Sequence, residues 1–500
     1  MKLVFVFDPH AWGEPRARWT IANIAPLLDA PWREARVERG GGAAALRADE
    51  ICVFVGHPKA APAEAAVVIP VRDWPAWSAV WLERGEFDGA PLAAPGRIEP
   101  TLAERDLPAE WLPALWHAMS REEEREDPRR DQWDCYSGAF TRLGVIGLLE
   151  TPWVNLSVEA LRKRLEAACG PRGIKPDRIP RWKNGARFAV ALSHDVDDIR
   201  LRSVRQSLRL MATSRAAGSY ASRAGLSSLA RALAGGGRDP YSQFERWAGE
   251  ESRRGFRSTF FVFARPRPAH EYDALYTLSD RLRFEGKRPR AGTMFCAMAG
   301  EGFEIGLHGS YESWRDADAL ITQRTALARA TGQEILSTRQ HFLRLDVAET
   351  LEAQEQAGLV TDATLGYNEA IGFRAGIAAP FHPWDPNRDL GLGPVRGGGR
   401  ELLEVPLTLM DGALFRAMAL SPEQAVARTI AQLEAVEAVG GMAGLLWHPN
   451  AAAESLFPGW WGCFVAALDH LAARGAWVTS VGEIAAWWRE RALRLAPEDR

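Results

Sequence analysis

The fold of this chain is decided by positions 187–198, which read RFAVALSHDVDD. Successive side chains of a β-strand point to opposite faces of its sheet. The large apolar side chains of this stretch share one face, which we expect to pack on outer helices: Phe188, Val190 and Leu192. The small side chains share the other face, which suits a tight interior: Ala189, Ala191 and Ser193. Continued past the apolar part, the alternation puts Asp195 and Asp197 on the inner face.

Strand-like and helix-like segments alternate through the rest of the chain. The strand-like segments are short and apolar: Ser258–Phe263, Phe303–Leu307, Leu402–Leu407, Gly444–Trp447 and Trp477–Ser480. The helix-like segments include Ser242–Gly255, Ala317–Ala330, Val347–Ala357, Pro422–Val439, Trp460–Ala473 and Val481–Arg494. This alternation predicts a parallel sheet closed into a distorted (β/α) barrel over residues 186–495. In such barrels the chemistry lies at the carboxyl ends of the strands.

The first part of the chain has the pattern of a smaller α/β domain. Residues 1–140 contain the strand-like segments Leu3–Phe7, Ile51–Val55 and Ala66–Val71. Residues 141–185 follow as a helix and an extended connector rich in Pro, Gly and basic side chains. No glycine-rich nucleotide motif follows the first strand, so we expect an accessory role for this domain. Asp8 interrupts the apolar start too early for a signal peptide, which favours a strand and predicts a cytoplasmic protein.

The composition narrows the class of protein. The chain is 47% hydrophobic and 25% charged, with a net charge of −3. These values are typical of a globular protein and do not indicate a nucleic-acid partner. The five cysteines are widely spaced and form no CxxC pair, which argues against a disulfide scaffold and against a zinc–thiolate site.

The acidic end of the 187–198 stretch is the first candidate site. Two carboxylates two residues apart on one face suit a metal ligand and a general base, Asp197 and Asp195. The alternative is an Asp-rich loop that caps the next helix, because Asp is a favoured N-cap residue. Asp198 lies off the inner face and is our candidate for that cap.

Three further strand ends carry polar side chains. His308 follows the strand-like segment Phe303–Leu307 between two glycines, and His448 follows Gly444–Trp447. Either histidine suits a ligand or an acid–base role, although a lone histidine is often a packed one. In the segment that begins with Arg339, the arginine could orient a carboxylate and His341 could bind a metal. Alone, that segment would be interpreted as a basic surface turn.

Aromatic side chains beside these segments are the candidates for substrate binding. Phe373 and Arg374 form an aromatic–arginine pair that suits a sugar or an anionic ligand, and Trp447 precedes His448. This signal is weak without the other motifs.

Taken in order, these segments resemble the polysaccharide deacetylase family, the carbohydrate esterases of family four, and its chitooligosaccharide-deacetylase-like members. The similarity spans about Pro180 to Glu490. The segment Ser193–Asp197 looks like the first family motif, and His308, Arg339 and His448 match residues of later motifs. The segments Arg339–His341, Phe373–Gly376 and Pro406–Asp411 are similar to one bacterial subgroup, which carries an N-terminal extension.

The resemblance implies a metal-dependent hydrolase of non-peptide C–N bonds. Asp197 and His308 would hold a divalent metal, with zinc expected, and Asp195 would act as the base with Arg339 beside it. His448 would protonate the leaving amine. The family usually has a second histidine four residues after the first, but here that position is Glu312. His341 is our preferred third ligand because imidazole suits zinc, and Glu312 is the alternative.

The expected substrate is an N-acetylated saccharide or a lipid-linked glycan. The alternatives are an amidohydrolase that acts on a non-sugar amide and a barrel that binds glycan without turnover. Between Arg200 and Arg238 lie eight arginines and no acid. This segment could contact a membrane surface or an anionic glycan, or it could be a helix pair packed on the barrel.

Overall fold

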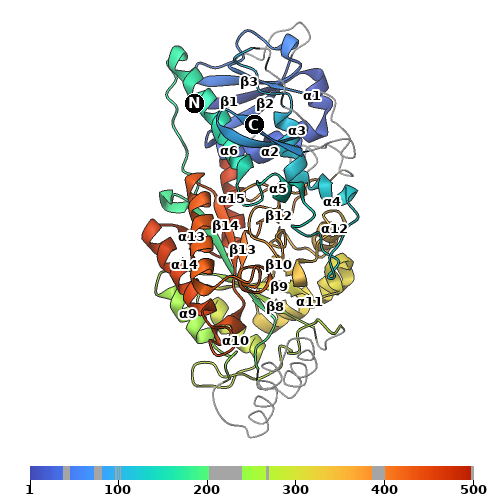
Figure 1. Ribbon diagram of the computed structural model, residues 1–500, viewed down its shortest axis with the longest axis vertical. Coiled ribbons are helices and arrows are strands. Elements are labelled where there is room, and N and C mark those ends of the chain that lie inside the picture. The colour runs from blue at the N-terminus through green and yellow to red at the C-terminus, as the bar shows by residue number, and fades with distance from the viewer. Residues whose placement is uncertain are drawn as a thin grey trace.

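The computed structural model describes residues 1–37, 46–71, 82–95, 98, 101, 103–201, 239–265, 270–385 and 400–496. A smaller α/β region at the top of the view stands above a larger barrel (Figure 1). The two regions contain the N-terminal and C-terminal parts of the chain, respectively.

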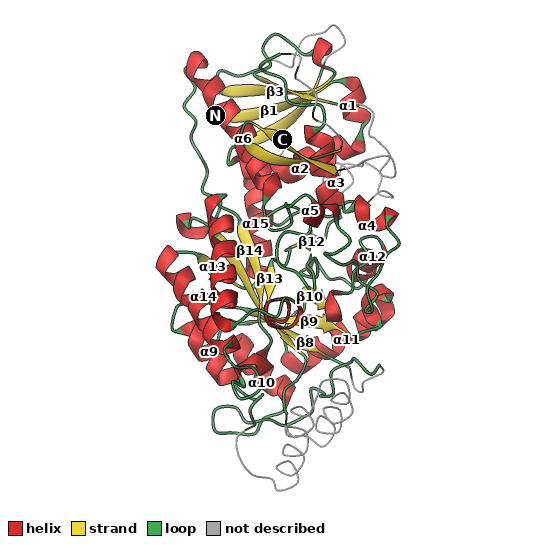
Figure 2. Ribbon diagram, in the orientation of Figure 1, coloured by secondary structure: helices red, strands yellow, loops and turns green. Residues whose placement is uncertain are grey.

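A four-stranded parallel sheet forms the centre of the N-terminal region (Figure 2). Its strands are β1 (Lys2–Phe7), β2 (Trp32–Arg36), β3 (Glu50–Gly56) and β4 (Val67–Pro70), in the order β2-β1-β3-β4. Every residue of β3 is buried, as are all residues of β1 except its first. Continuous apolar runs of this kind are typical of parallel strands that are covered on both faces.

Helices and one hairpin complete the N-terminal region. The helices are α1 (Pro9–Gly13), α2 (Pro15–Ile24), α3 (Trp111–Ser120), α4 (Glu122–Glu126), α5 (Arg142–Val145) and α6 (Trp153–Cys169). The hairpin pairs β5 (Leu82–Phe87) with β6 (Ala90–Pro95). Leu3, Phe5 and Phe7 of β1 belong to one hydrophobic core with side chains of α2, α3 and α6.

A second sheet forms the barrel. Its strands are β7 (Ala189–Val196), β8 (Thr259–Phe263), β9 (Glu304–Gly309), β10 (Ser337–Gln340), β11 (Thr361–Asp362), β12 (Leu403–Glu404), β13 (Leu409–Met410), β14 (Met442–Leu446) and β15 (Trp477–Thr479). Eight of them follow the order β12-β11-β10-β9-β8-β7-β14-β13, and β15 pairs with the start of β7. All their pairings are parallel.

The segment between β12 and β13 closes the curled sheet, because its backbone bonds to chain segments on both sides of it. The amide of Leu407 donates to the carbonyl of Leu365 at 3.0 Å, and the amide of Thr408 donates to the carbonyl of Gly444 at 2.8 Å. A Cβ atom on Gly444 would lie 2.3 Å from the carbonyl oxygen of Pro406, so only glycine fits there. The strand predicted at Leu402–Leu407 is shorter in the structure, where β12 covers only Leu403–Glu404 and β13 follows at Leu409–Met410, because the chain changes its pairing partner between them.

Helices surround the barrel. They are α9 (Phe244–Ser252), α10 (Ala291–Gly300), α11 (Ala317–Thr331), α12 (Glu349–Gln356), α13 (Pro422–Ala438), α14 (Trp460–Arg474) and α15 (Val481–Leu495). In the view α13 and α14 lie on one side of the barrel and α11 and α12 on the other (Figure 1). The predicted distorted (β/α) barrel, preceded by a smaller α/β region, is confirmed.

The two faces of β7 belong to two different hydrophobic cores, as the alternation predicts. Phe188, Val190 and Leu192 pack in one core with side chains of α9, α10 and α14. Ala189 and Ala191 belong instead to the core that includes the N-terminal region. The N-terminal region therefore shares its core with the inside of the barrel at the start of β7.

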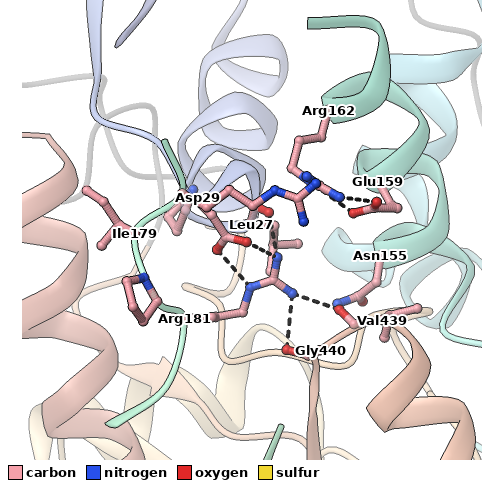
Figure 3. Close-up of polar contacts among 12 residues, drawn as sticks. Leu27, Asp29, Asn155, Glu159, Arg162, Ile179, Arg181, Val439 and Gly440 are labelled. Carbon is pink, nitrogen blue, oxygen red and sulfur yellow. Dashed lines mark hydrogen bonds and ion pairs between the residues drawn. The ribbon is translucent and has the colours of Figure 1, made fainter. Parts of the chain in front are cut away.

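The connector between the regions is tied to both of them by Arg181 (Figure 3). Its guanidinium donates to the Asp29 carboxylate at 3.0 and 2.8 Å and to the Leu27 carbonyl at 2.7 Å. It also donates to the carbonyls of Val439 and Gly440 at 2.8 and 3.1 Å. One partly buried side chain thus joins the N-terminal region to the end of α13.

Two sequence expectations concern membrane contact. Within the described residues, no helix combines the length and the apolar character needed to cross a bilayer. The arginine-rich segment proposed for membrane contact lies almost wholly outside the described residues, as does any helix that Asp198 would cap. At its start, Arg200 forms an ion pair with Asp280 at 2.8 Å.

Candidate functional site

Polar side chains converge at the carboxyl ends of β7, β9, β10 and β14. Asp195 lies near the end of β7, and Asp197 directly follows this strand. His308 on β9 is paired directly with Arg339 on β10, so the two lie at the same height in the sheet. His341 directly follows β10, and His448 follows β14 with one residue between them. Parallel register thus brings the predicted residues to one edge of the barrel.

Asp197, His308 and His341 form a compact group that could hold a metal ion. One potential ligand atom of each lies within 4.8 Å of those of the others. The Nε2 atoms of His308 and His341 lie 3.2 and 3.4 Å from Oδ1 of Asp197. Among the described residues, neither Asp197 Oδ1 nor His308 Nε2 has a partner with hydrogen-bond geometry, although both atoms are buried. Buried polar atoms without partners are costly, and a cation between them would remove that cost.

The tautomer of His308 and the neutral form of His341 suit ligation. His308 Nδ1 lies 2.9 Å from the carbonyl of Arg339, so it carries the proton and leaves the Nε2 lone pair for a ligand. Burial lowers the pKa of His308, but the Asp195 and Asp197 carboxylates outweigh it and raise the pKa overall. Burial dominates at His341 and lowers its pKa to about 4, which leaves that imidazole neutral at pH 7.

The acidity of Asp197 fits the same group. Burial acts to raise the pKa of its carboxyl, but His341, His308 and His448 hold it well below its ordinary value. Glu312, the alternative third ligand, is outside the group. Its side chain is 57% exposed and lies 3.7 Å from His270 and 3.8 Å from Arg344.

Asp195 is held by the buried guanidinium of Arg339. Arg339 Nη1 donates to Asp195 Oδ1 at 2.9 Å and to Ser193 Oγ at 2.8 Å, and Nε donates to the Ala363 carbonyl at 2.8 Å. The guanidinium also lies over the ring of Phe261, 4.6 Å from its centroid. Every one of these contacts restrains Arg339, so the Asp195 carboxylate has a defined orientation.

His448 lies on another side of Asp197 and has its own carboxylate partner. Its Nε2 is 3.6 Å from Asp197 Oδ2, and its Nδ1 is 2.7 Å from Asp411 Oδ1. The amide of His448 also donates to Asp411 at 2.9 Å. Burial lowers the pKa of His448, but Asp411 and then Asp197 and Asp195 outweigh it and raise the pKa to about 9. His448 is therefore a charged imidazolium at neutral pH, able to donate a proton.

The sequence reasoning assigned no role to Asp411. The sequence signal for this residue is an acid at the end of the largely apolar segment Leu407–Met410. It also missed the buried pair of His194 and Glu251, whose Nε2 and Oε1 atoms are 2.7 Å apart. His194 Nδ1 contacts the carbonyl of Trp447 at 2.7 Å, so this pair joins the ends of β7 and β14.

The three substrate-binding candidates do not reach this group. Phe373, Arg374 and Trp447 are at most 2% exposed. Arg374 is bound to the Glu124 carboxylate of α4 and to the carbonyl of Gly366. Trp447 packs toward the outer helices, with its ring 5.7 Å from that of Phe464. All three side chains are buried and packed or paired within the protein, so their contact with substrate stays a prediction.

The charged run at Arg121–Asp131 explains the position of Arg374. Three of its charged side chains are buried, since Arg121, Glu123 and Glu124 are each at most 3% exposed. Glu124 accepts from Arg121 Nε at 2.7 Å and from Arg374 Nε at 2.8 Å. The partner for the buried arginine of the barrel thus comes from the N-terminal region.

Comparisons with known proteins find similarity only among solved structures. No protein-family profile matches the chain, and no curated protein matches it significantly. A protein of Mycobacterium smegmatis assigned as a polysaccharide deacetylase is 21% identical, with a TM-score of 0.41 over 62% of this chain and 93% of that one. One of Pseudomonas aeruginosa, with the same assignment, is 14% identical, with a TM-score of 0.40 over 64% and 97%.

A pseudoenzyme of carbohydrate esterase family four from Bacillus anthracis is 12% identical. Its TM-score is 0.29, over 60% of this chain and 66% of that one. At these values the matches do not decide the function, which must be argued from the side chains of this chain.

Proposed function

We propose that this chain is a divalent-metal-dependent hydrolase that removes the N-acetyl group from a saccharide. The observation that carries the proposal is the convergence of Asp197, His308 and His341, flanked by Asp195 and His448. A group of two imidazoles and one carboxylate is a common catalytic zinc site, because it leaves a coordination position open.

The fit to a metal rests on buried atoms that lack partners. Asp197 Oδ1 and His308 Nε2 face each other without hydrogen-bond geometry. His341 Nε2 lies close to the same carboxylate oxygen, at 3.4 Å. His308 is already held in the tautomer that ligation needs. A divalent ion bound there would polarise the acetyl carbonyl and acidify a water molecule, and nitrogen ligands favour zinc.

Asp195 is the proposed general base. Its carboxylate takes a proton from the water whose oxygen forms the new bond to the acetyl carbon. Arg339 restrains this carboxylate through Oδ1 at 2.9 Å and is itself fixed by three other contacts, which keeps the base aimed. Preorganised groups of this kind need no rearrangement when the reaction occurs.

His448 is the proposed general acid. When the C–N bond breaks, the leaving nitrogen takes a proton from Nε2, and the products are acetate and a free amino group. Asp411 accepts from Nδ1 at 2.7 Å, which sets the ring orientation and favours the protonated form. The presence of both a restrained base and a charged acid favours turnover over a barrel that only binds glycan.

The substrate is the finer part of the proposal. A non-sugar amide would use the same groups, so acetate release must be compared across substrates. The cytoplasmic location, the zinc identity and a lipid-linked form of the saccharide also remain predictions from the sequence.

The test is acetate release from N-acetylglucosamine oligomers and from a panel of non-sugar acetamides by the zinc-supplemented protein. Asp195→Asn and His448→Gln should each lower kcat about 10²–10⁴-fold, as expected for loss of a general base or acid. Thermal unfolding should show that both variants are folded.

Asp469→Asn is a matched control, since this carboxylate is 63% exposed on α14 and pairs with Arg254. It should leave acetate release unchanged. Wild-type rates in either site variant would disprove the assignment, and turnover of only non-sugar amides would replace the substrate class.

A further inference from the structure

A cluster of aromatic side chains borders the metal-binding group. Phe342 directly follows His341, and their rings are 4.6 Å apart. Trp133 stacks on Phe342 with ring centroids 4.6 Å apart and an interplanar angle of 29°. Tyr272 contacts both, at 4.9 Å from Trp133 and 5.4 Å from Phe342. Trp133, Tyr272 and Phe342 are each partly exposed, so we call these three residues the aromatic rim.

The backbone of Phe342 is held in an unusual conformation. Phe342 has φ 57° and Leu343 has φ 52°, in the left-handed region that side chains other than glycine rarely adopt. The carbonyl of Phe342 accepts from Asn368 Nδ2 at 2.7 Å and from the thiol of Cys135 at 3.3 Å. Burial raises the pKa of Cys135 to about 12, so that thiol keeps its proton. Strained backbone that neighbours over-determine is concentrated at functional sites.

Trp133 comes from the N-terminal part of the chain, on a loop that is built to hold it. The Asp131 carboxylate accepts from the amides of Trp133 at 2.8 Å and Cys135 at 2.9 Å. Asp134, with φ 62°, completes the loop and reaches Arg344 at 3.4 Å. In the view this segment runs from α4 down beside α12 to the barrel (Figure 1). The loop is therefore attached to the turn that follows His341.

The rim combines apolar faces with polar neighbours. Phe342 covers one face of the Trp133 ring and the Tyr272 ring meets it nearly at a right angle, which leaves the rest of the indole partly exposed. Asp134, with a side chain 49% exposed, lies on the same loop, next to Trp133. A sugar ring has an apolar C–H face and a polar rim of hydroxyls, so a site that binds it needs both an apolar surface and polar groups. Three large rings that lie side by side and stay partly exposed form a contiguous apolar patch, a feature of ligand-binding grooves.

We propose that the aromatic rim is a sugar-binding subsite, which packs against a pyranose ring next to the one that carries the acetyl group under attack. This rests on the proposed function, since it assigns the same substrate to the same site. The occupant is an oligosaccharide of at least two rings with equatorial substituents, because only such rings present a flat C–H face to Trp133. The N-terminal region then has a direct part in substrate choice.

The test measures binding of N-acetylglucosamine tetramer by calorimetry to the full chain carrying Asp195→Asn, which prevents turnover. Adding Trp133→Ala should raise Kd about ten-fold, the usual size of one aromatic contact, and Trp133→Phe should restore most of the affinity. In the active protein, Trp133→Ala should raise KM for the tetramer by a similar factor. Its effect should be smaller for the monosaccharide, which cannot reach both positions.

Trp477→Ala is the matched control, because Trp477 is also partly exposed but lies at the start of β15. It should leave the Kd of the tetramer unchanged. If Trp133→Ala does not fold, Tyr272→Ala on a separate loop tests the same rim. A wild-type Kd in folded Trp133→Ala and Tyr272→Ala variants would overturn the subsite even if the protein is a deacetylase. Absence of acetate release from every saccharide would instead refute the proposed function.

Discussion

Two groups of charged side chains in this molecule differ in how their buried polar atoms are paired. In the first, Asp197 Oδ1 and His308 Nε2 are buried, and among the described residues they lack hydrogen-bond partners. In the second, Glu124 is bound by Arg121 and Arg374, at 2.7 and 2.8 Å to one carboxylate oxygen. Arg374 also donates to a carbonyl, at 2.7 Å.

The difference separates a candidate site from a structural ion pair. A buried charge is expensive unless it is paired, and the Glu124 group meets this requirement within the protein. In the Asp197 group, Asp197 Oδ1 and His308 Nε2 lack hydrogen-bond geometry, and a bound cation would complete their pairing. Burial and charge alone therefore do not identify a ligand-binding site. Buried polar atoms that face one point and lack hydrogen-bond partners do indicate one.

The largest expected effect comes from removing His341. His341→Ala should lower the zinc content from about one per chain to a small fraction and reduce acetate release about a thousand-fold or more, because metal catalysis contributes several kcal/mol. Metal analysis after dialysis measures this directly. Glu312→Ala is the control and should keep its zinc, since Glu312 lies outside the group. Full zinc in His341→Ala and loss in Glu312→Ala would reverse the assignment of the third ligand.

The next largest effect is expected from removing Glu124, the carboxylate of the fully paired group. Glu124→Ala leaves Arg121 and Arg374 buried without their carboxylate and should cost about 3–5 kcal/mol of the free energy of unfolding. Urea denaturation measures this loss. Zinc content of the folded variant should stay at the wild-type level, because Glu124 does not touch the metal group. A stable variant that loses zinc would show that the two groups are not separate in function.

The loss of stability of the protein in acid should depend on the Glu124 carboxylate. Burial acts to raise the pKa of Glu124, but Arg374 and Arg121 lower it to about 2. Because the pKa of Glu124 is lower in the folded protein, its ionised carboxylate stabilises the fold at pH values above its ordinary pKa of 4.5. This stabilisation is lost as the pH falls toward about 2. The shift corresponds to roughly 3 kcal/mol. Unfolding free energies measured between about pH 5 and pH 3 should fall less steeply in Glu124→Gln than in the wild type, and equal slopes would contradict this.

The smallest effect is expected at Asp411. Asp411→Asn removes the charged partner of His448 but leaves its ring in place, so kcat should fall about ten-fold, in line with 1.5–3 kcal/mol for a hydrogen bond to a charged group. KM should change little, because Asp411 is buried and acts through His448. A larger change in KM than in kcat would indicate that Asp411 serves substrate binding instead.

Much of the site was predictable because strand geometry is local. Alternation along β7 assigns Asp195 to the inner face, and the ends of parallel strands meet at one edge of a sheet. The partner of Arg374 could not be predicted, because the sequence pattern around this residue does not reveal it. Glu124 lies 250 positions away in the chain, and only the packed structure brings the two together.

By itself, the sequence determined that a strand ends in paired acids, that β-α units repeat after it, and that histidines follow later strands. These features depend on residue type and on spacings of a few residues. The tertiary structure decided that His341, and not Glu312, joins Asp197 and His308, and that Asp411 faces His448. It also brought Trp133 of the N-terminal part to Phe342. The reason is physical: convergence depends on strand order and on turns such as the left-handed one at Phe342, where distant contacts outweigh local preference.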